Sequence, residues 1–358
     1  MANAKLNFEG KYFRVTKRID GKQIPFYGKS KKEAELKRKE YEKLLEQGID
    51  PKMASMSLRV AMNDWLDAFG SLGLKKSSQE RYKGIFDNHI KESKISLVEV
   101  NKLSRISLQK FFNESTYTHG QVDAIIKLIN KFYHYAVSDG YANRNPCIGF
   151  TNPKHREEKE IEIFTPEEIE RLLKVESRHQ CQIKLMLYTG MRLGEALALT
   201  WNDIDFKNRT IKVDKAYDSK ARLTTPKTKG STRLFVFPDH MAADLQKKKR
   251  LTIEEKLLNG SDLTDLVFPS IVGTPLSQRN FRKQYENILK EAKVGYRPPH
   301  TLRHTFTTSA KRMGIPIEDV AQMLGHSSIK TTREVYLHYG AEDLRSLVND
   351  MYKKEEKA

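Results

Sequence analysis

Residues 300–339 decide the fold of the chain's second half and read HTLRHTFTTSAKRMGIPIEDVAQMLGHSSIKTTREVYLHY. His300 and Arg303 are three residues apart, which places both side chains on one face of a predicted helix. A further imidazole follows at His326, in a loop predicted between two further helices, and a phenol follows at Tyr336. This combination of groups is poorly suited to binding a metal and well suited to holding a phosphate beside a nucleophile.

The spacing of the histidines argues against zinc. A zinc helix of the His-Glu-x-x-His type carries its glutamate directly after the first histidine. Here Thr-Leu-Arg separates His300 from His304, so a cation stands between the two imidazoles. We therefore expect no metal and no other cofactor at this site, and we interpret His304 as structural.

The composition points to a polyanionic partner. The chain has 358 residues and a formal net charge of +18, and cations placed at nucleic-acid phosphates gain affinity by releasing counterions. Its 46 acidic residues exclude a disordered basic tail. Two cysteines are too few for a disulfide framework, and no run approaches the roughly 18 apolar residues of a membrane span. These features predict a cytoplasmic protein with no membrane role.

Residues 1–50 form a small predicted module of a β-ribbon and a helix. Two short β-prone runs flank Asp20-Gly21, a hairpin turn signal, and Ser30 with Glu33 forms a capping box that begins the helix. Such a ribbon buries little surface but can lie in a DNA groove, and the alternative is a solvated appendage. The candidate DNA-binding residues of this module are Arg14, Lys17 and Arg18.

Residues 58–145 are predicted to form an all-α domain. Apolar residues recur at helical spacing in four segments, and Ser77 with Glu80 is predicted to cap the second helix. Cations lie largely off the apolar faces, where they either line DNA or form an ordinary charged surface. The candidate DNA-binding residues here are Lys75, Lys76 and Arg81.

Residues 160–358 read as a mixed α+β domain that ends in a charged helix. Within it, Arg192 lies in the predicted helix 191–199, and a guanidinium that forks onto phosphate oxygens suits a pentacoordinate phosphorane. Glu195 follows three residues later and is placed to hold that guanidinium from behind. The alternative is an ordinary ion pair on a helix surface.

Lys227 lies in a basic, proline-bearing loop, residues 224–231, between strands predicted over 209–217 and 233–237. A turn of this kind can bring one ammonium into a minor groove or onto a leaving oxygen. Lys229 competes for the same role, and a solvated hairpin tip is the alternative for both.

Tyr336 is the candidate nucleophile. A phenol has a pKa of about 10, so it needs deprotonation or nearby positive charge before it attacks phosphorus. The surrounding arginines, histidines and lysine supply that charge. Tyr339 and Tyr285 are other available phenols, and the alternative for Tyr336 is an ordinary packed aromatic.

Six candidate catalytic residues occur in one domain. They are Arg192, Lys227, His300, Arg303, His326 and Tyr336. With their flanking residues, among them Thr-Gly before Met-Arg192 and Leu-Gly before His326, they resemble the tyrosine recombinase family in its phage-integrase branch. The resemblance is most specific over residues 164–340. It extends to 58–145, similar to the helical (SAM-like) core-binding domain of that family, and to 1–50, similar to its β-ribbon arm-binding domain.

The resemblance implies a mainly α, multidomain DNA recombinase. Tyr336 would attack a scissile phosphate to give a 3′-phosphotyrosyl link and a free 5′-hydroxyl. Arg192 and Arg303 would hold the non-bridging oxygens, and Lys227 would protonate the leaving oxygen. His300 would act as acid and base near the tyrosine, with His326 donating a hydrogen bond.

The implied partners are double-stranded DNA at core and arm attachment sites and three further copies of the chain, a homotetramer that works through a Holliday junction. An excisionase and a host DNA-bending protein are the implied accessory partners. The expected function is integration and excision of a prophage or mobile element. Alternatives are a resolvase or type IB-like topoisomerase with the same chemistry, and a catalytically silent DNA-binding regulator.

Overall fold

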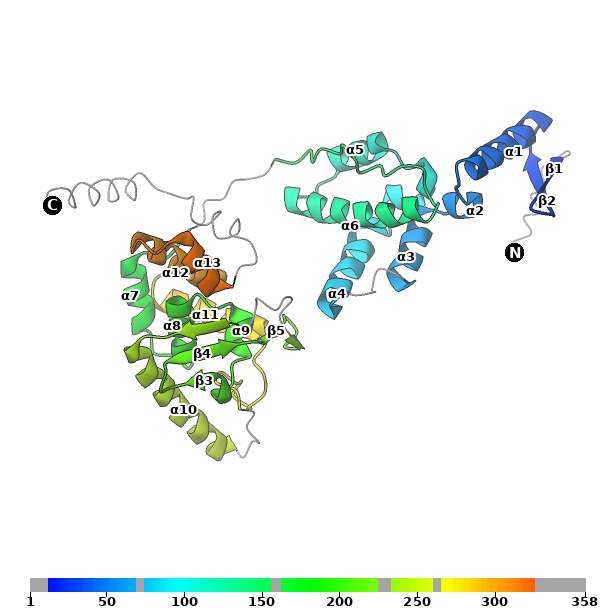
Figure 1. Cartoon of the computed structure of the whole chain (residues 1–358). Helices are drawn as coiled ribbons and strands as arrows, with labels where there is room; N and C mark the ends of the chain where they lie inside the picture. The colour runs from blue at the N-terminus through cyan, green and yellow to red at the C-terminus, as the bar shows by residue number, and fades with distance from the viewer. Residues whose placement is uncertain (1–11, 69–73, 156–161, 225–232, 260–264, 326–358) are drawn as a thin grey trace. The chain divides into compact units, whose positions relative to one another are not determined.

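The computed structural model describes residues 12–68, 74–155, 162–224, 233–259 and 265–325. Its contacts divide the chain into two compact units, Met1–Glu158 and Lys159–Ala358, which are described separately (Figure 1). Both units are mainly helical and the sheets are small. None of the helices within the described ranges has the length and apolar character needed to cross a bilayer.

The first unit begins with a hairpin, strands β1 (Phe13–Ile19) and β2 (Lys22–Gly28), followed by helix α1 (Lys31–Glu46). Asp20 and Gly21 form the predicted two-residue turn, and both have the positive φ (47° and 79°) of a type I′ turn. The predicted capping pair is confirmed, because the Ser30 side chain accepts a bond from the Glu33 amide at 3.2 Å. The Glu33 carboxylate returns to the amide of Lys29 at 2.7 Å.

The rest of this unit is helical around one apolar core. Its helices are α2 (Pro51–Ala54), α3 (Leu58–Ala68), α4 (Lys76–Ile85), a π-helical turn (Phe86–Ile90), short 3₁₀ turns (Lys94–Leu97 and Val100–Lys102), α5 (Arg105–Glu114) and α6 (His119–Ser138). The core includes Leu58, Met62, Trp65, Phe86, Phe112, Ile129 and Phe132. The four predicted amphipathic helices are therefore present as α3 to α6.

The predicted cap of α4 is wrong. Ser77 lies inside the helix, whose N-cap is Lys75, and no side chain caps it. The amide of Ser78 already bonds the Lys75 carbonyl at 2.8 Å, so the first turn closes before a Ser77 cap could act. The side-chain amide of Gln79 instead donates a hydrogen bond to the Leu74 carbonyl at 3.0 Å, which holds the chain that leads into the helix.

The second unit combines seven helices with two small antiparallel sheets in its described part. The helices are α7 (Pro166–Lys174), α8 (Gln180–Thr189), α9 (Leu193–Leu197), α10 (Asp239–Asn259), α11 (Gln278–Glu291), α12 (His300–Arg312) and α13 (Ile317–Leu324). The strands are β3 (Ile204–Asp205), β4 (Thr210–Val213), β5 (Ala216–Tyr217), β6 (Leu223–Thr224) and β7 (Arg233–Val236), and a 3₁₀ turn covers Trp201–Asp203.

The sheet order is β3-β4-β7, with a separate β5-β6 hairpin. The predicted strand 209–217 is therefore wrong as one element, because it breaks after Val213 and resumes as β5. The break lets β5 pack against α9, where the Tyr217 carbonyl lies so close to Gly194 that a Cβ there would collide with it. That packing forms one wall of the site below.

Candidate active site

Arg192 lies at the junction of α8 and α9. Helix α8 ends at Thr189, and Gly190 caps it in the left-handed conformation (φ 66°). A Cβ at Gly190 would lie 2.6 Å from atoms of both Phe306 and Leu324, so only glycine fits this turn. Arg192 is then the extended N-cap of α9, which corrects the predicted helix 191–199: only Leu193–Leu197 is helical.

Glu195 binds Arg192 twice, as the sequence predicted. One carboxylate oxygen accepts from the Arg192 side chain at 2.9 Å, and the other accepts from the Arg192 backbone amide at 2.9 Å. That second oxygen also accepts from the guanidinium of Arg233 at 2.7 Å. Burial acts to raise the pKa of Glu195, but the charges of Arg233 and Arg192 outweigh it and hold this pKa below its ordinary value.

Arg303 is almost completely buried, with 2% of its surface exposed. Its two terminal nitrogens donate to the backbone carbonyls of Gly190 at 2.7 Å and Leu324 at 2.9 Å, so the guanidinium joins the ends of α8 and α13. Burial lowers the pKa of Arg303 to about 9, and the positive charge of Arg192 contributes to the shift. The group stays charged near neutral pH, and an anion beside it would relieve the repulsion.

His300 is the first residue of α12 and is exposed. Its ring meets that of His304 edge to face, with centroids 4.6 Å apart. Desolvation lowers the pKa of His300 to about 4, and the charges of His304, Arg303 and Arg192 act in the same direction. The imidazole is therefore neutral near pH 7 and is able to accept a proton.

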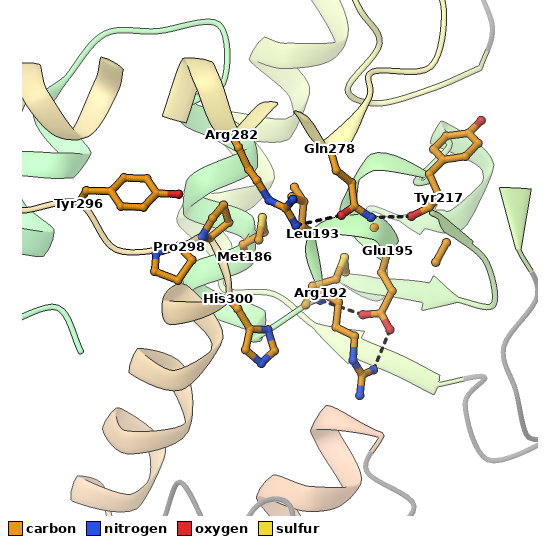
Figure 2. A pocket seen from close by; sticks show the side chains of 14 residues that line it. Met186, Arg192, Leu193, Glu195, Tyr217, Gln278, Arg282, Tyr296, Pro298 and His300 are labelled. Carbon is orange, nitrogen blue, oxygen red and sulfur yellow. Dashed lines mark hydrogen bonds and ion pairs between the residues drawn. The ribbon is translucent and has the colours of Figure 1, made fainter. Parts of the chain in front are cut away.

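A pocket of about 660 Å³ brings Arg192 and His300 together. Figure 2 shows both side chains extending toward the same side of it, one from the turn before α9 and one from α12. The pocket lining also includes Glu195, Gly194, Tyr217, Gln278, Arg282, Tyr296 and Pro298. Arg303 is not part of this lining; it is buried, and its charge acts on His300 and Arg192.

The charges at this place favour an anion. Arg192 and Arg233 contact Glu195, and the Glu195 charge also acts on Arg303. Three guanidiniums and one carboxylate leave an excess of two positive charges. A phosphodiester carries one negative charge and its pentacoordinate transition state carries more, so the arrangement suits phosphoryl chemistry.

The other predicted site residues have different outcomes. Lys227, Lys229, His326 and Tyr336, with Tyr339, lie outside the described residues. Of the predicted DNA contacts, Arg14, Lys17 and Arg18 are exposed on β1, Lys76 and Arg81 are exposed on α4, and Lys75 is half-buried at its N-cap.

Tyr285 is not an available phenol, which corrects that part of the prediction. It is fully buried in α11, stacked on Phe281 with ring centroids 5.8 Å apart, and burial raises its pKa. A tyrosine in this environment resists the deprotonation that a nucleophile needs.

Sequence reasoning missed Arg233. Its partner Glu195 is 38 residues away, so no local spacing connects the two. One signal was available: strand alternation puts Arg233 on the same face as the buried Phe235, and an inward cation needs a buried anion.

Comparison with known proteins shows the family to which the chain belongs. The model of the phage integrase family matches residues 162–342. A XerC-like tyrosine recombinase from Caldanaerobacter subterraneus is 33% identical over 361 residues, covering 91% of this chain and 92% of the relative. The ICEBs1 integrase of Bacillus subtilis is 26% identical over 277 residues, covering 74% of each chain.

Solved structures show the same fold. The Tn1549 transposon integrase in complex with circular intermediate DNA has a TM-score of 0.67 at 19% identity, covering 83% of this chain and 100% of that one. A lambda integrase tetramer bound to a Holliday junction has a TM-score of 0.59 at 16% identity, covering 90% and 92%. The chain belongs to the phage integrase family of tyrosine recombinases, enzymes that cleave and rejoin DNA at specific sites.

Proposed function

We propose that this chain is the integrase of a prophage or an integrative element, acting on DNA in the cytoplasm of a bacterial host. The observation that carries the proposal is the meeting of Arg192 and His300 in one pocket, with the charge of the buried Arg303 acting on both. The relatives named integrases support the choice of mobile-element DNA as the substrate.

The proposed reaction is a transesterification at a DNA phosphate. The Tyr336 oxygen attacks phosphorus, the bond to the 5′-oxygen breaks, and a 3′-phosphotyrosyl link forms with a free 5′-hydroxyl. One phosphodiester replaces another, so the step needs no ATP. The 5′-hydroxyl of a partner strand then reverses the step and completes the exchange.

Each candidate residue has a proposed role. Arg192 binds a non-bridging oxygen, and Glu195 limits the rotamers of its guanidinium. Arg303 stabilises the charge that develops on phosphorus. His300, neutral in the free protein, accepts the proton of Tyr336. Lys227 protonates the leaving oxygen, with Lys229 as the competing donor, and His326 donates a hydrogen bond to the phosphate.

The proposed domain organisation follows the family. Residues 1–50 bind arm sites, 58–145 bind the core site, and 160–358 form the catalytic domain with its tail helix. The exposed cations of the β1–β2 hairpin support the first assignment, because an exposed ribbon suits a DNA groove. The active assembly would be a homotetramer on two sites, assisted by an excisionase and a host DNA-bending protein.

The test is a covalent adduct between the protein and DNA that carries its attachment site. The DNA flanking the gene is the first source of that site. We expect the unsubstituted chain to give a band that survives denaturing electrophoresis and Tyr336→Phe to give none. Tyr285→Phe is the matched control. The phenol of Tyr285 is buried, so its removal should not change the yield of adduct.

Three results would count against the proposal. An adduct that survives Tyr336→Phe would mean another nucleophile. Tight specific binding with no cleavage on suicide substrates would favour a silent regulator. Relaxation of any supercoiled plasmid without site preference would favour a topoisomerase.

A further inference from the structure

We propose that Arg233 is a positioning residue for strand cleavage: it fixes Glu195, and through Glu195 it fixes the Arg192 guanidinium toward the scissile phosphate. The inference rests on the proposed function of Arg192. Arg233 itself is not part of the pocket lining, so its effect passes through the carboxylate.

The Glu195 carboxylate binds two guanidinium groups, those of Arg233 and Arg192. Arg233 donates to one oxygen of Glu195 at 2.7 Å, and Arg192 donates to the other at 2.9 Å. The Arg233 side chain is 7% exposed and that of Glu195 is 9%, whereas that of Arg192 is 41% exposed. Arg233 therefore anchors the carboxylate from the protein interior, and Arg192 faces the solvent side where DNA would bind.

The anchor is rigid because Arg233 is itself confined. Its guanidinium lies 4.7 Å from the ring centroid of Phe235, the next inward residue of β7. A Cβ at Gly325 would lie 2.8 Å from the Arg233 Cδ and 3.0 Å from its Nη1, so the side chain lies flat against that glycine. A buried arginine held on both sides loses little further entropy when it binds its carboxylate.

The same contacts connect the anchor to the end of α13. Gly325 caps α13 in the left-handed conformation, and the preceding Leu324 carbonyl accepts from Arg303 at 2.9 Å. Arg233 and Arg303 thus hold one turn from two sides. This turn directly precedes His326 in the sequence.

The alternative is that Arg233 only stabilises the fold, since breaking a buried ion pair leaves an uncompensated charge. The experiment therefore needs a readout that folding alone does not change. We would measure single-turnover adduct formation by the full chain, with DNA affinity and thermal unfolding measured on the same samples. The variants are Arg233→Met, which keeps much of the stem and removes the charge, and Arg233→Lys, which keeps a charge without the fork.

Lys212→Met is the matched control. Lys212 is on strand β4, where it lies opposite Leu234 of β7. Its ammonium is exposed and pairs with Asp214 at 2.9 Å. We expect this variant to cleave at the unsubstituted rate. Arg233→Met should cleave roughly 10- to 100-fold more slowly with DNA affinity little changed, because a misplaced group costs rate rather than binding. Arg233→Lys should be intermediate.

The decisive comparison uses a scissile methylphosphonate in place of the phosphate. This substrate lacks one charged oxygen, so a correctly aimed Arg192 matters less to its cleavage. If Arg233 acts by positioning, the Arg233→Met penalty should shrink about 10-fold or more on this substrate. If Arg233→Met does not fold, Arg233→Lys decides by the same comparison.

Two results would overturn the inference: an unchanged cleavage rate, or an equal penalty on both substrates, whatever the unfolding temperature. Neither would affect the proposed function, which Tyr336→Phe tests separately. Conversely, the absence of any adduct with the unsubstituted chain would remove the proposed function and, with it, the reason to position Arg192.

Discussion

At the scale of single residues, the neutral state of His300 has a measurable consequence. Its pKa is lowered to about 4 in the free protein, below the ordinary value near 6.5. A bound phosphate adds negative charge beside it and raises that pKa. Between the two values, DNA binding should therefore take up a proton, and affinity should rise as the pH falls through this window.

Calorimetry at about pH 5.5 in two buffers with different ionisation enthalpies would measure this uptake. We expect up to one proton per protomer with the unsubstituted chain and clearly less with His300→Gln. Equal uptake by both proteins would assign the proton to another group. In the free protein the same pKa shift affects folding. The contribution of neutral His300 to the free energy of unfolding is fully present above pH ~6.5 and is lost as the pH falls toward ~4, because the unfolded chain binds the proton more readily.

The residue scale is also where sequence reasoning succeeded and failed most clearly. The pairing of Glu195 with Arg192 follows from a spacing of three residues and is confirmed. The second partner, Arg233, comes from a strand far along the chain, and only tertiary packing brings it to the carboxylate. The prediction that Tyr285 is an available phenol failed for the same reason, since the burial of its side chain depends on elements outside its own helix.

At the scale of elements, the ends of α8 and α13 meet the side of α12 around Gly190. Its carbonyl binds Arg303 of α12, and its missing side chain leaves room for Phe306 of α12 and Leu324 of α13. The strand break after Val213 and the short α9 were not predictable from local pattern, because both result from packing of β5 on α9. Well-capped helices such as α7, with Thr165 before Pro166, were predictable.

Gly190→Ala tests how far this junction supports the site. The substitution strains a left-handed residue, which costs roughly 1–2 kcal/mol, and adds overpacking of roughly 1–3 kcal/mol. Gly314→Ala is the matched control: Gly314 has a similar φ of 76°, but its Cβ would meet no atom within 4 Å. Denaturant unfolding should show a loss in Gly190→Ala larger than in Gly314→Ala.

Cleavage should follow the same order. Gly190→Ala should lose adduct formation at temperatures where it is still folded, because the carbonyl that binds Arg303 moves with the turn. Gly314→Ala should cleave at nearly the unsubstituted rate. Equal losses of stability in the two variants would mean that Phe306 and Leu324 can move enough to accommodate a methyl group at position 190.

At the scale of the whole molecule, charge and fold class were the most predictable properties. A net charge of +18 is a sum over the chain and needs no contacts to be known. The mainly helical architecture followed from apolar periodicity, which buries one face of each helix whatever its neighbours are. The arrangement of elements around the site depended on long-range pairs, and the sequence alone does not specify those.

That net charge predicts salt-dependent binding to DNA phosphates, which differs in its consequences from binding through base contacts. For a protein that neutralises six to ten phosphates, affinity falls by about 10³–10⁵ between 50 and 200 mM salt, on any sequence. Base contacts add affinity only at the attachment site and survive the salt. Nicking or relaxation of plasmids without the site should therefore disappear by about 200 mM salt, while adduct formation at the site persists.

Plasmids with and without the attachment site, compared across a salt series, would measure this difference. The Tyr336→Phe variant is the control, since it should retain the salt dependence of binding and lose cleavage of both plasmids. A site-specific recombinase gives a cleavage ratio between the plasmids that rises with salt, because non-specific binding is lost first. A ratio that stays near one at every salt concentration would instead mean that the chain uses this chemistry to relax DNA without regard to sequence.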